Sequence, residues 1–224
     1  MTFYQQLLDE TEAERRFLMS QPVITECMAG RITLETYIAF LEQAYHHVKF
    51  TVPLLMACGA RLPERLEWLR EAVAEYIEEE TGHQEWILND IKACGGDAEA
   101  VRTGRPAMAT DVMVAYAWDC VLRRNPVSFF GMILVLEGTS VHLATDAAAV
   151  IQKALDLPDK AFSYLRSHGS LDIEHIGFYE QLVNRLEDPP DKAAVRDTAR
   201  VMYRLYANIF ASLPGVTAGA KEAA

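Results

Sequence analysis

Two stretches of the sequence carry histidines and carboxylates at spacings suited to holding metal ions. Glu80 and His83 interrupt a stripe of apolar residues that recur every three or four positions, as on one face of a helix. His168, Asp172 and His175 interrupt a second stripe in the same way. At about 100° per residue, these three positions lie within roughly 60° of one another. Both sets of side chains are therefore predicted to point inward with the apolar residues.

Glu137 is a single acid in a third apolar stripe. Burying an unpaired carboxylate costs several kcal/mol, and lysine and arginine are nearly absent from these stripes, so the obvious cationic partners are missing. Metal ions would satisfy all of these groups at once. Carboxylates and imidazoles form the ligand set of a non-heme di-iron site, and Glu-x-x-His is the unit used in di-iron helical bundles. The predicted ligands are Glu80, His83, Glu137, His168, Asp172 and His175.

The run from Glu78 to Glu80 also has a simpler interpretation. Three consecutive acids are typical of a solvated helix face, and only the spacing of the stripe favours Glu80 over Glu79 as the inward residue. Glu78 and Glu79 are expected on the flanks. The choice between Glu79 and Glu80 stays open at this point.

Glycines adjoin three of the predicted ligands. Gly82, Gly138 and Gly169 each stand inside an expected helix, where glycine costs on the order of 1 kcal/mol relative to alanine. Their repeated placement indicates room for a ligand, a kink or a substrate near the centre of the molecule.

The remaining histidines have more ordinary interpretations. His46 and His47 are consecutive, so at least one leaves the apolar face, and we place them beside the site or at the surface. His142 is expected to be structural. Three tyrosines are expected in the core, where they could also line a substrate pocket: Tyr45, Tyr76 and Tyr179.

Helical periodicity covers nearly the whole chain, and no stretch alternates as a strand would. The sequence therefore predicts an all-α bundle of about seven helices in a single domain over 1–214, followed by a flexible tail over 215–224. The predicted helices span 3–20, 33–57, 63–93, 108–123, 127–155, 158–187 and 191–212.

Composition narrows the possible partners and surroundings. The formal net charge of −11 disfavours nucleic acid and anionic membrane surfaces. The apolar run near 129–136 is too short for a membrane span, and no signal peptide is recognisable. The four cysteines lack a CxxC pair, which favours reduced, buried thiols in a cytoplasmic protein. A homodimer is expected, since a bundle of this kind can expose a helix face.

The elements Glu80-Thr81-Gly82-His83, Glu137 and His168-Gly-Ser-Leu-Asp172-Ile-Glu-His175 resemble the heme-oxygenase-like di-iron oxidases. The resemblance covers about residues 30–212 and implies the seven-helix bundle shared by heme oxygenases and TenA proteins. It also implies two iron ions per chain, the second held more weakly. One iron would be held by Glu80, His83 and His168, the other by Glu137, Asp172 and His175, with a bridging carboxylate.

Members of that family react their iron(II) form with dioxygen and oxidise or cleave small substrates, either amino acids or fatty acids. The resemblance therefore implies an iron-dependent oxidoreductase whose partners are dioxygen and a small molecule. The sequence does not distinguish between the two substrate classes.

Related proteins of the same fold provide the competing interpretations. A thiaminase-type enzyme would have an aspartate where this chain has Ala44, and a cysteine in the segment 129–140, which has none. A heme oxygenase would hold heme through a histidine in its first helix, but no histidine precedes His46. A TenA-like, thiaminase-related hydrolase or a non-catalytic ligand-binding bundle remains the alternative function.

Overall fold

The computed structural model describes residues 1–215, apart from the side chains of residues 170–174. Regular secondary structure in this part of the chain is entirely helical, which confirms the predicted all-α class. The predicted division at residue 214 stays a prediction, because residues 216–224 lie outside the described part. The α-helices are α1 (Phe3–Glu10), α2 (Glu12–Met19), α3 (Pro22–Met28), α4 (Leu34–Val48), α5 (Thr51–Arg61), α6 (Glu67–Glu80), α7 (His83–Ala93), α8 (Ala98–Thr103), α9 (Met108–Arg123), α10 (Phe129–Leu155), α11 (Ser163–Asn184) and α12 (Pro189–Ser212).

Several predicted helices are divided in the structure. The spans 108–123, 127–155 and 191–212 correspond closely to α9, α10 and α12. The span 33–57 divides into α4 and α5, because Pro53 lacks an N–H group and its ring would clash with the carbonyl of Lys49 in a continuous helix. The span 3–20 divides at Thr11, and 63–93 divides between α6 and α7. Helices α3 and α8 form where none was predicted.

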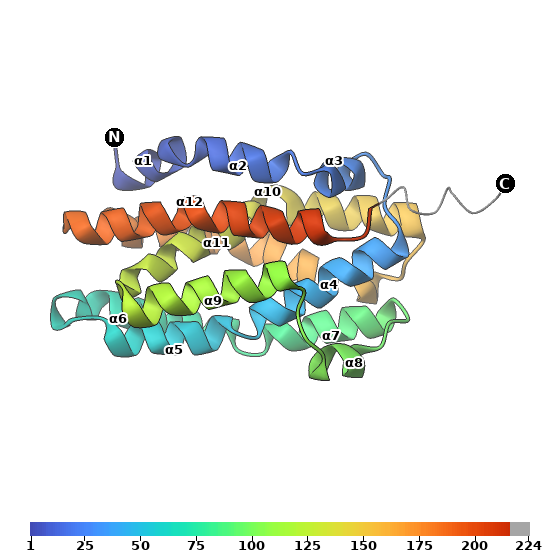
Figure 1. The fold of residues 1–224 in the computed structure, drawn as a ribbon, viewed down its shortest axis with the longest axis horizontal. Helices are drawn as coiled ribbons and strands as arrows, with labels where there is room; N and C mark the ends of the chain where they lie inside the picture. Colours follow the sequence, from blue (N-terminus) through green and yellow to red (C-terminus); the bar gives the residue numbers. More distant parts are fainter. Residues whose placement is uncertain (216–224) are drawn as a thin grey trace.

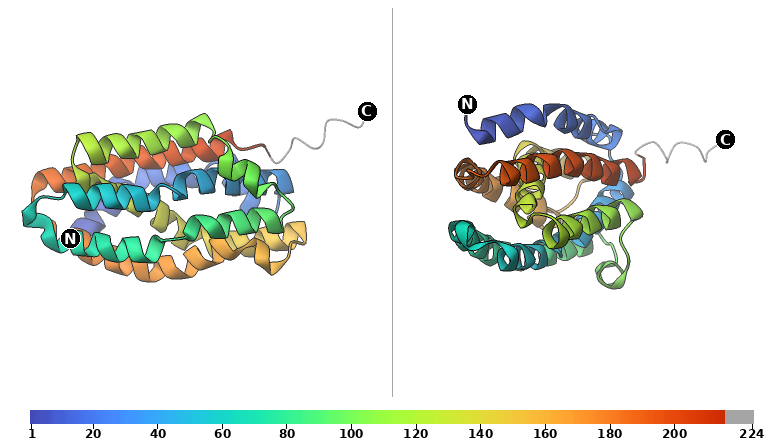
Figure 2. Two further views of the ribbon diagram at one scale, coloured as in Figure 1. Left: turned by 90° about the horizontal axis from the view of Figure 1, so that it is seen from below. Right: turned by 60° about the vertical axis from the view of Figure 1, so that its left-hand side comes forward.

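The helices run roughly along one direction in stacked layers (Figure 1). Helices α1 to α3 cover one side of the molecule and contact α12 and α10, while α5 to α8 lie on the opposite side (Figures 1 and 2). Helices α10 and α11 pack against each other, and α10 also contacts α12. The long helix α10 therefore joins α11 to α12.

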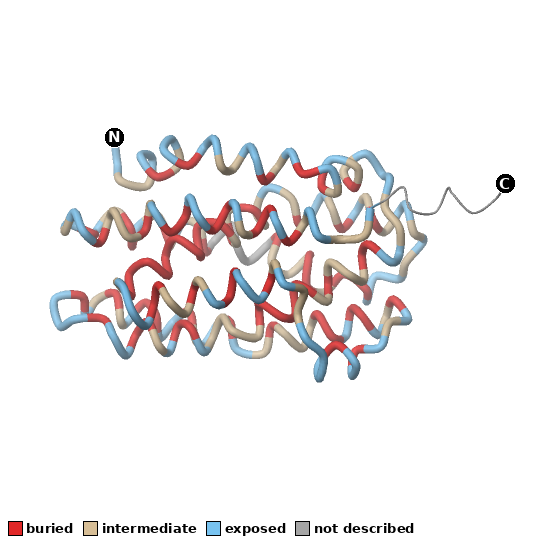
Figure 3. The backbone as a smooth tube through the Cα atoms, in the orientation of Figure 1, coloured by how far each residue is buried: buried red, intermediate tan, exposed pale blue. Residues whose placement is uncertain are grey.

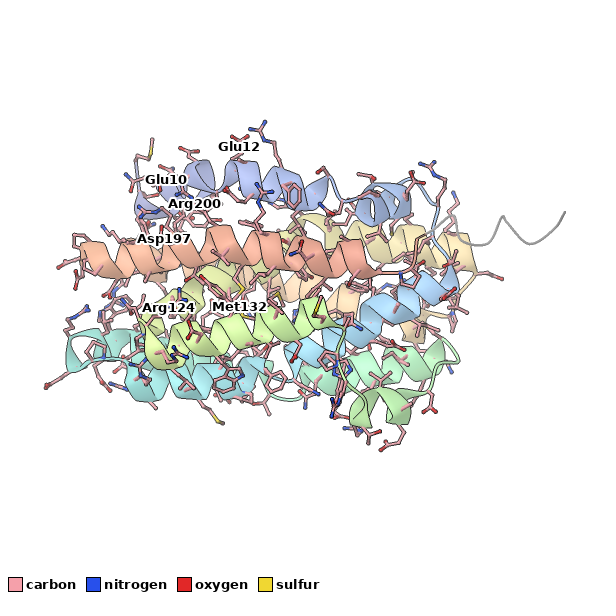
Figure 4. The ribbon with its side chains drawn as sticks, viewed as in Figure 1. Glu10, Glu12, Arg124, Met132, Asp197 and Arg200 are labelled. Atoms are coloured by element: carbon pink, nitrogen blue, oxygen red, sulfur yellow. The ribbon has the colours of Figure 1, made fainter. Side chains whose placement is uncertain are left out.

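The N-terminal helices are fastened to α12. Arg200 Nε donates a hydrogen bond to the carbonyl oxygen of Glu10 at 3.1 Å, and Arg196 Nε lies 3.4 Å from the Glu10 carboxylate (Figure 4). Exposed ion pairs contribute little to stability, so Leu7 and Leu18, both fully buried, carry most of the attachment.

Buried apolar side chains form two clusters, concentrated on the inner sides of the helices (Figure 3). In α10, the buried apolar side chains from 129 to 135 belong to the first cluster, and those from 144 to 151 belong to the second. The chain also changes cluster between α6 and α7, and again within α11. Polar residues lie at each point where the chain passes from one cluster to the other. We call these residues the polar seam: Glu80, His83, Glu137, His168 and His175.

A buried polar network holds the start of α12. The Asp191 carboxylate is 1% exposed and accepts hydrogen bonds from Arg65 Nη1 at 2.6 Å and Asn125 Nδ2 at 2.8 Å. Burial by itself raises the pKa of Asp191, but the hydrogen bonds from Arg65 and Asn125 and the charge of Arg65 outweigh it and leave the pKa below its usual value. Asp191 therefore joins three separate segments of the chain.

The segment Pro126–Leu155, which includes α10, is long and apolar enough to cross a membrane by length and composition. However, 67% of its most apolar window is buried inside the protein. This burial is what the central helix of a bundle requires, and the apolar character of α10 follows from its packing.

Candidate metal centre

The junction of α6 and α7 positions the first two predicted ligands. The sequence predicted one continuous helix through Glu80 and His83, and this detail is wrong. Helix α6 ends at Glu80, Thr81 has an extended conformation, and Gly82 has φ +97°, a left-handed conformation that favours glycine. The Thr81 hydroxyl donates to the carbonyl of Ile77 at 2.6 Å and satisfies one of the free carbonyls at the end of α6. The chain bends here, yet both side chains remain inside.

The other two glycines beside predicted ligands differ in their surroundings. A Cβ atom at Gly169 would come within 3.1 Å of the Thr145 backbone nitrogen, so this glycine permits close contact of α11 with α10. A Cβ atom at Gly138 would meet no atom within 4 Å. Gly82 therefore permits the bend between α6 and α7, Gly169 permits the close approach of α11 to α10, and Gly138 adjoins open space.

Asp90 of α7 fixes the beginning of α11. Its fully buried carboxylate accepts hydrogen bonds from Ser163 N at 3.0 Å and Tyr164 N at 2.9 Å, and it also accepts one from the Ser163 hydroxyl. Burial raises the pKa of Asp90, although these hydrogen bonds oppose the shift. The first amide groups of a helix lack partners within the helix, so Asp90 acts as its cap from a neighbouring element. Asp90 thereby fixes α7, which carries His83, relative to the start of α11, which carries His168.

Glu80, His83 and His168 form the first ligand group. One donor atom from each lies within 4.8 Å of the other two. Glu80 and His83 are 7% and 4% exposed, and His83 Nδ1 lies 3.2 Å from Glu80 Oε2. The His83 ring stacks on Trp86 with centroids 4.0 Å apart, and it meets the His168 ring edge-on at 5.0 Å. The three residues thus surround one point inside the bundle.

Glu80, Glu137 and His175 form the second group, again with donor atoms within 4.8 Å of one another. His175 Nδ1 lies 3.9 Å from Glu137 Oε1, and all three residues are buried. Asp172 is on α11, but its side chain lies outside the described residues. Glu80 therefore belongs to both groups, as a bridging carboxylate would.

Glu79 comes closer to the centre than the sequence suggested. It is exposed, as predicted, yet its Oε2 atom lies 3.2 Å from His175 Nε2. Glu79 belongs to neither group, whereas Glu80 belongs to both. Burial therefore favours Glu80 as the ligand, with Glu79 as a partner of His175.

The sequence predicted His47 beside the site or at the surface, and not among the ligands. It is 3% exposed, it lines the same cavity as His168, and its Nδ1 atom has no hydrogen-bond partner among the described residues. Burial, together with the smaller effects of nearby His168 and His46, lowers the pKa of His47 to about 3. His46 is also buried, whereas His142 is exposed. The apolar stripe of α4 did not decide between the two predicted placements of His47, because two consecutive histidines cannot both lie on one helix face.

The predicted core tyrosines are buried, and one of them adjoins the centre. Tyr45 and Tyr179 pack among apolar residues, and the Tyr179 hydroxyl donates to the carbonyl of Phe130 at 2.9 Å. The Tyr76 hydroxyl is buried without a hydrogen-bond partner in the described part of the chain, and its ring lies 6.0 Å from that of His175. Burial, and after it the charge of Glu137, raises the pKa of Tyr76, which keeps the hydroxyl protonated.

An apolar cavity adjoins the first ligand group. The space free of protein atoms in the cavity and its opening to solvent measures about 1230 Å³. Helices α3, α4, α10 and α12 supply most of its lining, including Met132, which is labelled in Figure 4. Glu80, Glu137 and His168 lie in its wall. A small molecule in this cavity would therefore be next to the metal ligands.

The donor set fits iron. Imidazole nitrogens and carboxylate oxygens suit divalent iron, and two groups that share one carboxylate suit a pair of ions. The predicted ligands whose side chains are described all participate in one or both groups. All four cysteines are free and buried, as predicted, and none belongs to either group.

A sequence profile of a family described as iron-containing redox enzymes matches residues 38–207, more than half of the chain. The chain belongs to this family. The matched range includes the residues of both candidate ligand groups. None of the curated proteins matches the chain by sequence.

Solved structures place this iron-containing redox enzyme in the heme oxygenase and TenA fold. A domain of unknown function with a heme oxygenase-like fold from Shewanella denitrificans has a TM-score of 0.82 and 23% identity, covering 94% of this chain and 91% of that one. A TenA homologue from P. horikoshii has a TM-score of 0.77 and 11% identity, covering 94% and 97%. Heme oxygenase-1 from Synechocystis, solved with heme, has a TM-score of 0.76 and 12% identity, covering 96% of this chain and 93% of that one. These likenesses confirm the predicted fold.

Proposed function

We propose that the chain is a non-heme di-iron oxidase that uses dioxygen to oxidise or cleave a small organic substrate. The observation that supports this most is Glu80, a buried carboxylate common to both three-residue groups. A single metal ion would need only one such group, whereas a carboxylate shared by two groups suits two ions.

The ligands would divide between the ions as the family resemblance implies. His83 and His168 would hold one ion, Glu137 and His175 would hold the other, and Glu80 would serve both. Asp172 is retained as a proposed ligand of the second ion. Two iron(II) ions bound there would supply the electrons that reduce dioxygen.

The surrounding residues would orient the ligands and keep water out. Stacking on Trp86 fixes the plane of the His83 ring, and the contact with Glu79 fixes His175. Such contacts beyond the ligands set ring orientation and metal affinity. The apolar cavity would give a substrate access to the centre and exclude bulk water from it.

An anaerobic iron(II) titration followed by a pulse of dioxygen tests the proposal. We expect about two irons per chain, in keeping with the two ligand groups, and consumption of dioxygen by the loaded protein. Binding of iron without any consumption of dioxygen would indicate a structural metal. Absence of iron binding would refute the proposal.

The alternative is a TenA-like, thiaminase-related hydrolase or a non-catalytic ligand-binding bundle. The likeness to TenA homologues favours it only at the level of the fold. Ala44 is 2% exposed and stands where a thiaminase-type enzyme would need an aspartate, which disfavours thiamine chemistry. Dioxygen and a small molecule remain the proposed partners. The homodimer, the cytoplasmic location and the lack of nucleic-acid and membrane partners stay predictions.

A further inference from the structure

Trp86 lies against the rings of two candidate iron ligands. Its indole stacks on the His83 ring with centroids 4.0 Å apart and planes 26° from parallel, and it meets the His168 ring at 6.3 Å. Residues three apart on a helix are neighbours, so α7 itself brings Trp86 beside His83. His168 comes from α11, which packs against α7. Trp86 therefore contacts both imidazoles of the first ligand group.

Trp86 also reaches the protein surface. It is partly exposed, whereas His83 is 4% exposed. His168 is partly exposed too, but it lines the apolar cavity, and Trp86 does not belong to the described lining of that cavity. Electron-transfer rates fall exponentially with distance, so a partly exposed ring in contact with ligand rings offers a short path between the metal centre and a molecule in solution. A reductant could use this path without entering the cavity.

The proposed reaction creates a need for such a path. Reduction of dioxygen to two waters takes four electrons and four protons, and two iron(II) ions would supply two of those electrons. A bound substrate would supply the other two electrons as it is oxidised. When the cavity is empty, the missing electrons must come from the protein or from solution. Tryptophan and tyrosine are among the most easily oxidised side chains.

Two tyrosines are the competing donors. The Tyr76 ring lies 6.0 Å from that of His175, and the Tyr164 ring lies 4.8 Å from that of His168. A phenol loses an electron readily only when its proton leaves at the same time, and the buried Tyr76 hydroxyl has no hydrogen-bond partner among the described residues to receive it. An indole can lose an electron before its N–H proton. Both tyrosines are buried, whereas Trp86 is partly exposed, so its proton can pass to water.

We propose that Trp86 donates electrons to the metal centre when dioxygen is consumed without substrate, and that a reductant in solution restores the indole. In each event Trp86 loses one electron to the oxidised centre. A one-electron reductant such as ascorbate then returns one electron to the indole and releases one proton. Two such events, with two further protons from water, complete the reduction of one dioxygen to two waters and leave two iron(III) ions. This inference rests on the proposed function and adds an electron path through a residue outside both ligand groups.

An oxygen pulse on the iron(II)-loaded protein without substrate tests the proposal by electron paramagnetic resonance of rapidly frozen samples. We expect a transient indole radical whose lifetime ascorbate shortens. Trp86→Phe, which retains an aromatic ring, should lose the radical while binding as much iron as the parent. Trp68→Phe and Trp118→Phe are the matched controls, because both residues are partly exposed and contact Arg185 and Phe50, respectively, rather than a described candidate ligand. An undiminished radical in Trp86→Phe would overturn the proposal.

Oxidation products give a second measurement that needs no variant. After repeated additions of iron(II) and dioxygen without substrate, peptide mass spectrometry should find oxygen added to Trp86, and ascorbate should suppress this change. Trp68 and Trp118 should stay unmodified, because the electrons would come from the residue in contact with the ligands. Equal oxidation of all three tryptophans would indicate attack from solution and overturn the proposal. Oxidation of Tyr76 or Tyr164 in place of Trp86 would overturn it as well, because the donor would be a different residue.

The iron titration separates this inference from the proposed function. The expected result is iron binding with both signals, and neither signal in iron-free protein treated with dioxygen. Iron binding with consumption of dioxygen, but with neither the radical nor oxidised Trp86, would refute the electron path and leave the di-iron proposal intact. Absence of iron binding would refute the di-iron proposal and, with it, this inference.

Discussion

Glu80 is the residue on which both ligand groups depend. Its neighbours Glu78 and Glu79 have the same side chain but are exposed, so the three positions differ mainly in where the backbone places them. Substituting each of these three glutamates in turn therefore compares the loss of the same side chain at one buried and two exposed positions.

We expect Glu80→Gln to reduce bound iron at both groups, from about two ions per chain to less than one, because an amide is a much weaker ligand than a carboxylate. Glu79→Gln should retain iron with lower affinity at the group that contains His175, since it removes the contact with that ring. Metal analysis after equilibrium dialysis measures both. Glu78→Gln is the control, and a loss of iron there equal to that in Glu80→Gln would contradict the assignment.

Residue types and spacing indicated most of the centre before the structure did. Each predicted ligand interrupted an apolar stripe, and a carboxylate buried among leucines requires a cation or hydrogen-bond donors close to it. The sequence left open whether His47 lies beside the site or at the surface, because the apolar stripe of its helix is not interrupted. Its proximity to His168 arises from tertiary packing between segments far apart in the sequence, which periodicity does not report.

At the scale of elements, the junction between α6 and α7 controls how the centre is built. The structure brings Glu80 and His83 close together, as the sequence predicted, but it breaks the helix between them. Gly82 could have indicated the break, yet glycine alone does not distinguish a tolerated helical position from a left-handed one. The conformation at Gly82 follows from the packing of α6 and α7 into different apolar clusters.

Gly82→Ala should lower the free energy of unfolding by about 1–2 kcal/mol, because a Cβ atom is strained in the left-handed conformation although no neighbouring atom obstructs it. Gly138→Ala is the matched comparison within a helix, with open space at the Cβ position. It should raise the free energy of unfolding by about 0.5–1 kcal/mol. Urea unfolding curves of the two variants measure the difference. Equal effects would show that backbone conformation does not distinguish the two sites.

Asp90 should link the stability of α11 to metal binding. Asp90→Ala leaves the first amide groups of α11 without their partner and should cost about 1–3 kcal/mol. It should also weaken iron binding, because His168 and His175 are on that helix. Asp97→Ala removes the cap of α8 and should lower stability by about 1 kcal/mol without altering iron affinity. Unchanged iron affinity in Asp90→Ala would contradict the positioning role.

For the molecule as a whole, the all-α class was predictable because periodicity extends through nearly the entire chain. The order of the long helices followed from the same pattern. The short helices α3 and α8 were missed, since six or seven residues provide too few turns for a stripe to emerge. How the layers stack depends on side-chain packing between distant segments, and no local pattern contains that information.

The network around Asp191 predicts how the fold responds to acid. Because the folded-state pKa of Asp191 is lowered, its contribution to stability is present above the unfolded value of about 3.9 and is lost as pH falls below it. Asp191→Asn should therefore lose about 1–3 kcal/mol at neutral pH and show a shallower decline in acid. Denaturant unfolding between pH 7 and about 3 measures this. Asp188→Asn, which alters a more exposed partner of Arg65, is the control and should follow the parent curve.

The polar seam draws its side chains from segments that are far apart along the chain, and this has a consequence for folding. Bringing them together requires closure of long loops, so the unfolded chain offers no preformed set of ligands. An ion that binds only the folded protein stabilises it in proportion to the logarithm of its concentration above the dissociation constant. Folding must therefore precede loading, and iron supply would determine how long each molecule survives proteolysis.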